Sequence, residues 1–282
     1  MDMNETASHK NVAPVLVGTD LSARSDRAVD RAMMLANSLQ ERLIVLHALE
    51  ADSVLKSDQT RIEREIRNAL AKPDADVDIL PAIGPAPSTI CSAAQSAGCR
   101  LVVTGVARMN HIGDYFIGTA VDHVIRNAAM PVLVVKQRPH HAYRSILVAT
   151  DCSPCSREAL LTAAALFPDA RLHVVHAFHV PYEAWLRSDE TRDEVTEAAH
   201  VCLTEFLADP AIADTLRKRV ELHLDYGQVD QVICAAAETL DADLIVLGTH
   251  GRSGFVRAMI GSRAEELLRC VSVDTLLVRE DC

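Results

Sequence analysis

The chain has 282 residues, of which 49% are hydrophobic, 24% are charged and only 4% are aromatic, with a formal net charge of −11. This balance is typical of a globular protein with an aliphatic core, and the length suits two domains better than one. The negative charge argues against broad nucleic-acid binding, because it repels a phosphate backbone.

The sequence shows neither a membrane-spanning run nor a secretory signal. No apolar run approaches the roughly 18 residues of a membrane helix, so we expect no membrane contact. The N-terminal stretch MDMNETASHKN is polar and does not read as a secretory signal. The eight cysteines are spread along the chain, and without such a signal we expect them to be reduced thiols in a cytoplasmic protein.

The chain repeats itself. An apolar run, then Thr-Asp, a Ser-containing turn and a helix-like pattern occur in residues 12–36 and again in residues 143–167. Further matching pairs are residues 42–50 with 171–179, and residues 101–136 with 244–279. We therefore predict two similar domains, residues 1–139 (the first half) and residues 140–282 (the second half), with the linker RPHHA at their junction.

Each half shows about five apolar runs of strand length, separated by helix-like stretches. In the second half the predicted strands cover residues 146–149, 172–177, 220–224, 244–247 and 275–278, and residues 188–219 are predicted to be helical and partly exposed. Continuous Val/Ile/Leu runs are typical of parallel strands covered on both faces. The element order predicts an α/β fold of two tandem, doubly wound, five-stranded parallel sheets.

The last strands of the two halves, Met130–Val135 and Val273–Val278, should pair with each other. An edge strand exposes unpaired backbone groups and tends to find a partner. Pairing within one chain would produce an intra-chain pseudo-dimer.

Two strand ends in the second half carry polar residues and glycines: Ala149-Thr150-Asp151 and Gly248-Thr249-His250-Gly251. Ligands of such sheets bind at the carboxyl ends of the strands. Glycines there allow backbone amides to approach a phosphate, or they serve as plain turn residues. Ser262 and Glu265 match a capping box at the start of a helix, and Asp151 could bond a ribose hydroxyl or an adenine edge.

The spacing G-x2-G-x9-G-[ST], from Gly248 to Ser262, joined by Thr150-Asp151, resembles the ATP-binding branch of the universal stress protein family. The resemblance covers both halves. It implies strand order 3-2-1-4-5, dimers formed through the last strand, and binding of ATP (or AMP or ADP) with Mg²⁺. It implies adenosine contacts at Ala149, Thr150, Asp151 and Ala177, and phosphate contacts at Gly248, Gly251, Arg252, Gly261 and Ser262.

The first half departs from this pattern. Thr19-Asp20 and Gly118-Thr119 match, but after Gly105 the residue Arg108 stands where the second glycine belongs. Its side chain would fill space that a triphosphate needs, or would contact the phosphate itself. We expect steric exclusion, which leaves the first half mainly structural or specific for another small ligand.

Cysteines and histidines give two further patterns. Cys152 and Cys155 form a C-x-x-C after a strand, which leaves a thiol-redox-responsive module open; no second C-x-x-C completes a zinc site. His173, His176 and His179 cluster in one predicted strand. His47 repeats His176 in the first half, which favours structural histidines over metal ligands.

We therefore predict a nucleotide-binding stress-response regulatory protein whose second half binds ATP. Its expected partner is an unidentified regulatory protein, and a homodimer is left open beside the intra-chain pseudo-dimer. No catalytic base with a dedicated nucleophile is visible in the sequence, which leaves catalysis open, and any ATP hydrolysis or autophosphorylation should be slow. The alternatives are a nucleotide hydrolase or nucleotidyl transferase of related fold, and an assembly module with an empty pocket.

Overall fold

A computed structural model describes residues 13–50, 58–106, 108–111, 114–116, 118–179, 189–250 and 260–280. The strands of the first half are β1 (Val15–Thr19), β2 (Leu43–Leu49), β3 (Asp78–Ile83), β4 (Leu101–Gly105), β5 (Arg108–His111), β6 (Asp114–Phe116) and β7 (Val132–Val135). Its helices are α1 (Asp26–Leu39), α2 (Gln59–Ala69), α3 (Ala86–Ser96) and α4 (Gly118–Asn127). The strands of the second half are β8 (Ser145–Ala149), β9 (Arg171–Phe178), β10 (Val220–Tyr226), β11 (Leu244–Gly248) and β12 (Asp274–Val278). Its helices are α5 (Pro154–Leu166), α6 (Asp189–Ala208), α7 (Asp214–Arg219), α8 (Val229–Thr239) and α9 (Ser262–Cys270).

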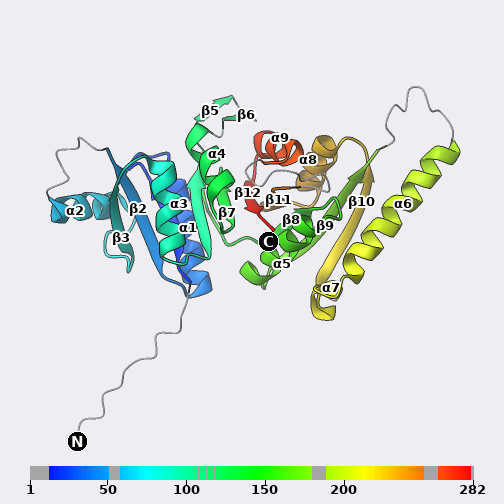
Figure 1. Ribbon diagram of the computed structural model, residues 1–282, viewed down its shortest axis with the longest axis horizontal. Helices are drawn as coiled ribbons and strands as arrows, with labels where there is room; N and C mark the ends of the chain where they lie inside the picture. Colours follow the sequence, from blue (N-terminus) through cyan, green and yellow to red (C-terminus); the bar gives the residue numbers. More distant parts are fainter. Residues whose placement is uncertain are drawn as a thin grey trace, which may run out of the picture.

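Ten of these strands form one continuous sheet in the order β10-β9-β8-β11-β12-β7-β4-β1-β2-β3 (Figure 1). Within each half the strands are parallel and follow the order 3-2-1-4-5, which confirms the predicted fold class. The halves join where β12 pairs antiparallel with β7, with Leu276 opposite Leu133. The predicted pairing of the last strands within one chain is thus confirmed, and it merges the two five-stranded sheets into one.

Helices cover both faces of the sheet, as the continuous apolar strands require. Alternate residues of a strand point to opposite faces, so Val15 and Val17 belong to one core while Leu16 belongs to the other. Helices α1, α2, α5, α6 and α7 pack on the first face, and α3, α4, α8 and α9 on the second. Each core extends through both halves. Among the described helices, none is both long enough and apolar enough to cross a membrane.

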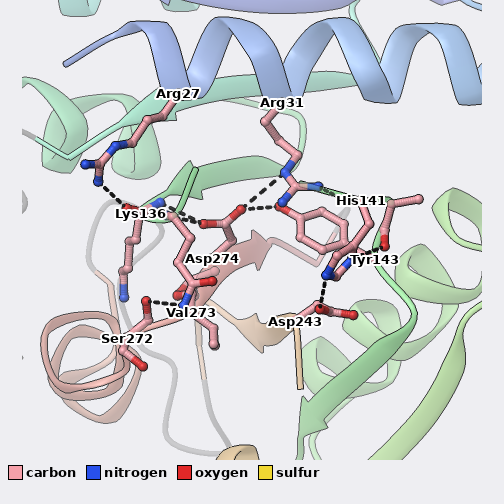
Figure 2. A network of polar contacts seen from close by, with 12 residues as sticks. Arg27, Arg31, Lys136, His141, Tyr143, Asp243, Ser272, Val273 and Asp274 are labelled. Carbon is pink, nitrogen blue, oxygen red and sulfur yellow. Dashed lines mark hydrogen bonds and ion pairs between the residues drawn. The ribbon is translucent and has the colours of Figure 1, made fainter. Parts of the chain in front are cut away.

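A buried polar network closes the seam between the halves (Figure 2). Asp274, at the start of β12, is 1% exposed; its Oδ1 accepts hydrogen bonds from the backbone N–H of Lys136 at 2.7 Å and of Gln137 at 2.9 Å. Its Oδ2 accepts from the phenol of Tyr143 at 2.5 Å and lies 3.4 Å from Nε of Arg31. The guanidinium of Arg31 also stacks 4.1 Å from the centre of the Tyr143 ring. A carboxylate this deeply buried is tolerated because a cation and several donors surround it.

Two basic side chains, each directly after the last strand of its half, cross the junction between the halves in opposite directions. Nζ of Lys136 lies 2.8 Å from the carbonyl oxygens of Leu268 and Val271, at the end of α9. Nη1 of Arg279 donates to the carbonyl oxygens of Arg126 at 2.8 Å and Ala128 at 3.3 Å, at the end of α4. Carbonyl groups at a helix C-terminus have no partner within the helix, so the basic side chain of each half supplies hydrogen bonds to the last helix of the other.

Strands β5 and β6 form a separate antiparallel hairpin, pairing Arg108 with Phe116. The sequence did not predict it, because alternation in these short strands is weak. The hairpin occupies the stretch where the first half departs from the glycine pattern. It lies against α9 of the second half.

Candidate functional site

A cavity of about 370 Å³ opens at the carboxyl ends of β8 and β11, beside α8 and α9. Its walls include every described residue that the sequence predicted for the second-half site: Ala149, Thr150, Asp151, Ala177, Gly248, Gly261 and Ser262. These residues come from four separate segments of the chain, so the fold brings the predicted set together. The volume lies in the range of small-molecule sites, about 300–1,000 Å³.

Hydrogen bonds around Thr150 fix the turn that carries Asp151 into the cavity wall. Oγ1 of Thr150 lies 2.8 Å from Oγ of Ser156, and it accepts the backbone N–H of Cys152 at 2.9 Å. Cys152 adopts a left-handed backbone conformation with φ of 60°. Oδ1 of Asp151 accepts the N–H of Ser153 at 3.0 Å. The half-buried carboxylate is therefore held at the rim rather than left to rotate freely.

At the two described glycines of the motif, neighbouring backbone leaves little room for a side chain. A Cβ on Gly248 would lie 3.1 Å from the carbonyl carbon and 3.2 Å from the carbonyl oxygen of Cys155 in α5. A Cβ on Gly261 would lie 3.3 Å from the carbonyl oxygen of Thr249, which accepts the Gly261 N–H at 2.7 Å. Close helix–strand and loop–loop packing thus explains both glycines without a ligand, although both also line the cavity.

The predicted capping box is wrong by one residue. Gly261 is the N-cap of α9, with no side-chain capping bond, and Ser262 is the first helical residue. The N–H of Glu265 instead bonds the carbonyl oxygen of Gly261 at 3.0 Å. Ser262 therefore does not cap its own helix. Its side chain stands in the cavity wall at the N-terminal end of α9, where free amides and the helix dipole favour an anion.

The cavity also has aliphatic lining residues that the sequence motifs did not predict. Its aliphatic lining residues are Val175, Val229, Ile233, Leu247 and Leu267. Strand alternation could have found Val175, since it shares a face with Ala177. The residues from α8 and α9 depend on how those helices pack. One cavity thus combines aliphatic side chains with a few polar groups, as small-molecule sites commonly do.

The first half has a smaller cavity, of about 250 Å³, at the equivalent place. Thr19, Asp20 and Gly105 line it, and the turn geometry recurs. Oγ1 of Thr19 lies 2.9 Å from Oγ of Ser25, and Leu21 has the same φ of 60° as Cys152. Burial opposes ionisation of Asp20, but hydrogen bonds from the side chain and backbone of Ser22 outweigh it and lower its pKa.

The two cysteines of the C-x-x-C have different surroundings. Cys155 is 2% exposed, and its Sγ lies 3.5 Å from the carbonyl oxygen of Val278. Cys152 is half-buried and lies close to His176 and Cys202. In both halves a histidine is held against the preceding turn: Nδ1 of His176 lies 2.8 Å from the carbonyl oxygen of Thr150, and Nδ1 of His47 lies 2.9 Å from that of Thr19.

Comparison with known proteins identifies the fold family. The model of the universal stress protein family matches residues 12–136 and again residues 142–279. The chain belongs to the universal stress protein family. Universal stress protein A homolog 1 of Coxiella burnetii is 33% identical over 153 residues, 48% of this chain and 96% of that protein. Universal stress protein E of Escherichia coli is 28% identical over 192 residues, 62% of this chain and 60% of that protein.

Solved structures agree on the fold. A functionally unknown protein from Pseudomonas aeruginosa has a TM-score of 0.68 at 22% identity, covering 96% of this chain and 93% of that chain. A universal stress protein from Archaeoglobus fulgidus has a TM-score of 0.63 at 17% identity, covering 95% and 98%. This universal stress protein is therefore a tandem one. Of its predicted ligand contacts, Gly251 and Arg252 lie outside the described residues, and so does the Arg108 side chain.

Proposed function

We propose that the second half of this universal stress protein binds ATP, with Mg²⁺ accompanying the phosphates, and that its occupancy regulates an unidentified protein partner. The observation that carries the proposal is the meeting of Ala149, Thr150, Asp151, Ala177, Gly248, Gly261 and Ser262 around one cavity. AMP or ADP would use the same adenosine contacts.

The mixed lining of the cavity suits the two ends of the nucleotide. Aliphatic residues such as Val175 and Ile233 offer an apolar surface to the adenine ring. Asp151 is the carboxylate suited to the ribose hydroxyls. The N-terminal end of α9 at Ser262 offers backbone amides and a positive dipole to the phosphates. Mg²⁺ keeps several waters and is commonly held through phosphates, so it needs no cage of protein ligands.

Two features of the first half argue against ATP binding there. Its cavity is smaller, about 250 Å³ against about 370 Å³. Its sequence carries Arg108 where a glycine belongs. We infer that ATP binds at one site per chain, and that residues 1–139 act mainly as a structural partner or hold another small ligand.

Calorimetric titration of the full chain with ATP and Mg²⁺ tests the proposal. We expect about one ATP per chain, with affinity lost in Asp151→Ala and in Gly251→Arg but retained in the matched variant Asp20→Ala. Two equivalent sites, one of them abolished by Asp20→Ala, would contradict the assignment. Unchanged affinity in Gly251→Arg would remove the phosphate-loop part of it.

Mass spectrometry of ligand released from the purified protein provides an independent readout. We expect an adenine nucleotide in substoichiometric or stoichiometric amount. Phosphate release in the same preparation would favour the hydrolase alternative, and transfer to an added acceptor would favour the nucleotidyl transferase. A partner-regulating role predicts slow or no turnover.

A further inference from the structure

Three potential metal ligands meet on the face of the sheet opposite the nucleotide cavity. Cys152 comes from the turn after β8, His176 from β9 and Cys202 from α6, and all three are half-buried. One donor atom of each lies within 4.8 Å of the other two. His176 and Val175 are adjacent in β9 and point to opposite faces, so this cluster and the cavity do not share side chains.

The imidazole of His176 makes a hydrogen bond of the kind that metal-binding histidines commonly make. Its Nδ1 lies 2.8 Å from the carbonyl oxygen of Thr150. A carbonyl only accepts hydrogen bonds, so Nδ1 carries the proton and donates it. Nε2 then keeps its lone pair for a metal. This outer hydrogen bond, which fixes the tautomer and the ring, is the usual companion of a ligating histidine.

We propose that Cys152, His176 and Cys202 bind Zn²⁺. Two thiolates and one neutral imidazole are ligands that zinc accepts, and three protein ligands leave a fourth position for water or an exogenous ligand. Bond lengths of about 2.3 Å to sulfur and 2.1 Å to nitrogen place tetrahedral donors roughly 3.5–3.8 Å apart. The donor atoms, which all lie within 4.8 Å of one another, therefore have to approach by at most about 1 Å, a shift on the scale of a side-chain rotation.

The first half provides an internal comparison. His47 makes the same bond to the carbonyl oxygen of Thr19, at 2.9 Å, and Leu21 takes the place of Cys152 with the same φ of 60°. The only cysteines of the first half are Cys91 and Cys99, both far along the chain from that turn. The histidine–carbonyl bond thus belongs to the fold of both halves, whereas the two thiols are an addition of the second half.

Other thiols and histidines need to be excluded in the test. Cys234 and Cys270 have sulfur atoms 3.4 Å apart, and His173, Glu221 and His223 form a second group of possible donors. The titration is therefore done on the full chain carrying Cys234→Ser and Cys270→Ser. Zinc is removed with a chelator, and Zn²⁺ is then added in competition with a chromophoric chelator.

In this background we expect one tight Zn²⁺ site per chain. Cys202→Ser, Cys152→Ser and His176→Ala should each weaken it by at least about 100-fold, more than the loss of an outer-shell partner does. His223→Ala and His47→Ala should leave it unchanged. With Co²⁺ in place of zinc, thiolate charge-transfer absorption should appear and should decrease in Cys202→Ser.

Circular dichroism and thermal unfolding of each variant separate loss of ligand from loss of fold. Cys202→Ser changes one half-buried atom on a helix, so we expect that variant to fold. Absence of a tight site in the background protein would overturn the proposal, and so would unchanged affinity in both cysteine variants. Neither result would bear on nucleotide binding, because the two sites lie on opposite faces of the sheet.

Discussion

Lys136 and Arg279 occupy equivalent positions at the ends of the last strands, and each donates hydrogen bonds to the carbonyl oxygens that end the other half's last helix. Lys136 is 1% exposed, whereas Arg279 is half-buried. The reciprocity is that of a two-fold dimer, but the two side chains differ in burial. Burial lowers the pKa of the Lys136 amine.

The pH dependence of the free energy of unfolding should show that the Lys136 amine loses its proton in the folded chain. Burial lowers the pKa of its amine to about 7 from 10.5, although Asp274 acts in the opposite direction. Between these values the unfolded chain binds a proton that the folded chain has released, so the free energy of unfolding rises with pH. We expect the wild type to gain stability relative to Lys136→Met from pH 7 upward, in urea titrations. Parallel stability curves for the two proteins would mean that the amine stays charged.

Neutralising Asp274 should destabilise the fold strongly. In Asp274→Asn, Arg31 becomes a buried cation without its counter-ion, and the Tyr143 phenol loses an anionic acceptor. Removing one partner of a buried pair costs about 3–5 kcal/mol, which urea unfolding can measure. The exposed control Asp74→Asn should stay within about 0.5 kcal/mol of wild type. Equal effects of the two substitutions would rule out this role of Asp274.

Two equivalent glycines should respond differently to a methyl group. A Cβ on Gly248 meets the backbone of Cys155 at 3.1 Å, whereas the nearest atom to a Cβ on Gly105 is 3.6 Å away. Gly248→Ala should destabilise the fold by about 1–3 kcal/mol through overpacking. Gly105→Ala should be neutral or slightly stabilising, by up to about 1 kcal/mol, because it restricts the unfolded chain. Thermal denaturation of both variants tests the contrast, which a reversed order would contradict.

A larger side chain in the second-half cavity should weaken ATP binding, whereas one in the first-half cavity should not. Ala177 and Ala48 are equivalent residues that line the second and the first cavity. Ala177→Leu should weaken ATP binding at least tenfold, about 1.4 kcal/mol, because the new side chain takes ligand volume. Ala48→Leu should leave ATP affinity unchanged in the same calorimetric titration. A loss confined to Ala48→Leu would instead assign ATP to the first half.

The strands could be predicted from the sequence, and so could the meeting of the predicted residues around one cavity, because both follow from local patterns. Val220–Leu224 was predicted and β10 spans Val220–Tyr226, and residues 188–219 contain α6 and α7. The glycine spacing and Thr150-Asp151 located the cavity, since parallel strand ends must share one edge.

What the sequence did not reveal depends on contacts between distant segments. Lys136 meets Leu268 only because the two halves dock, 132 residues apart in the chain. Cys202 joins Cys152 because α6 packs on β9, which no C-x-x-C spacing encodes. The packing reason for Gly248 required knowing where Cys155 lies.

The antiparallel pairing of β7 with β12 makes the association of the two halves independent of dilution. A homodimer dissociates as its concentration falls, and its stability cannot be separated from mass action. Here the partner is covalently attached, so its effective concentration is set by a short tether rather than by expression level. The halves are always present in a one-to-one ratio, which frees one of them to lose a ligand while the other keeps its neighbour.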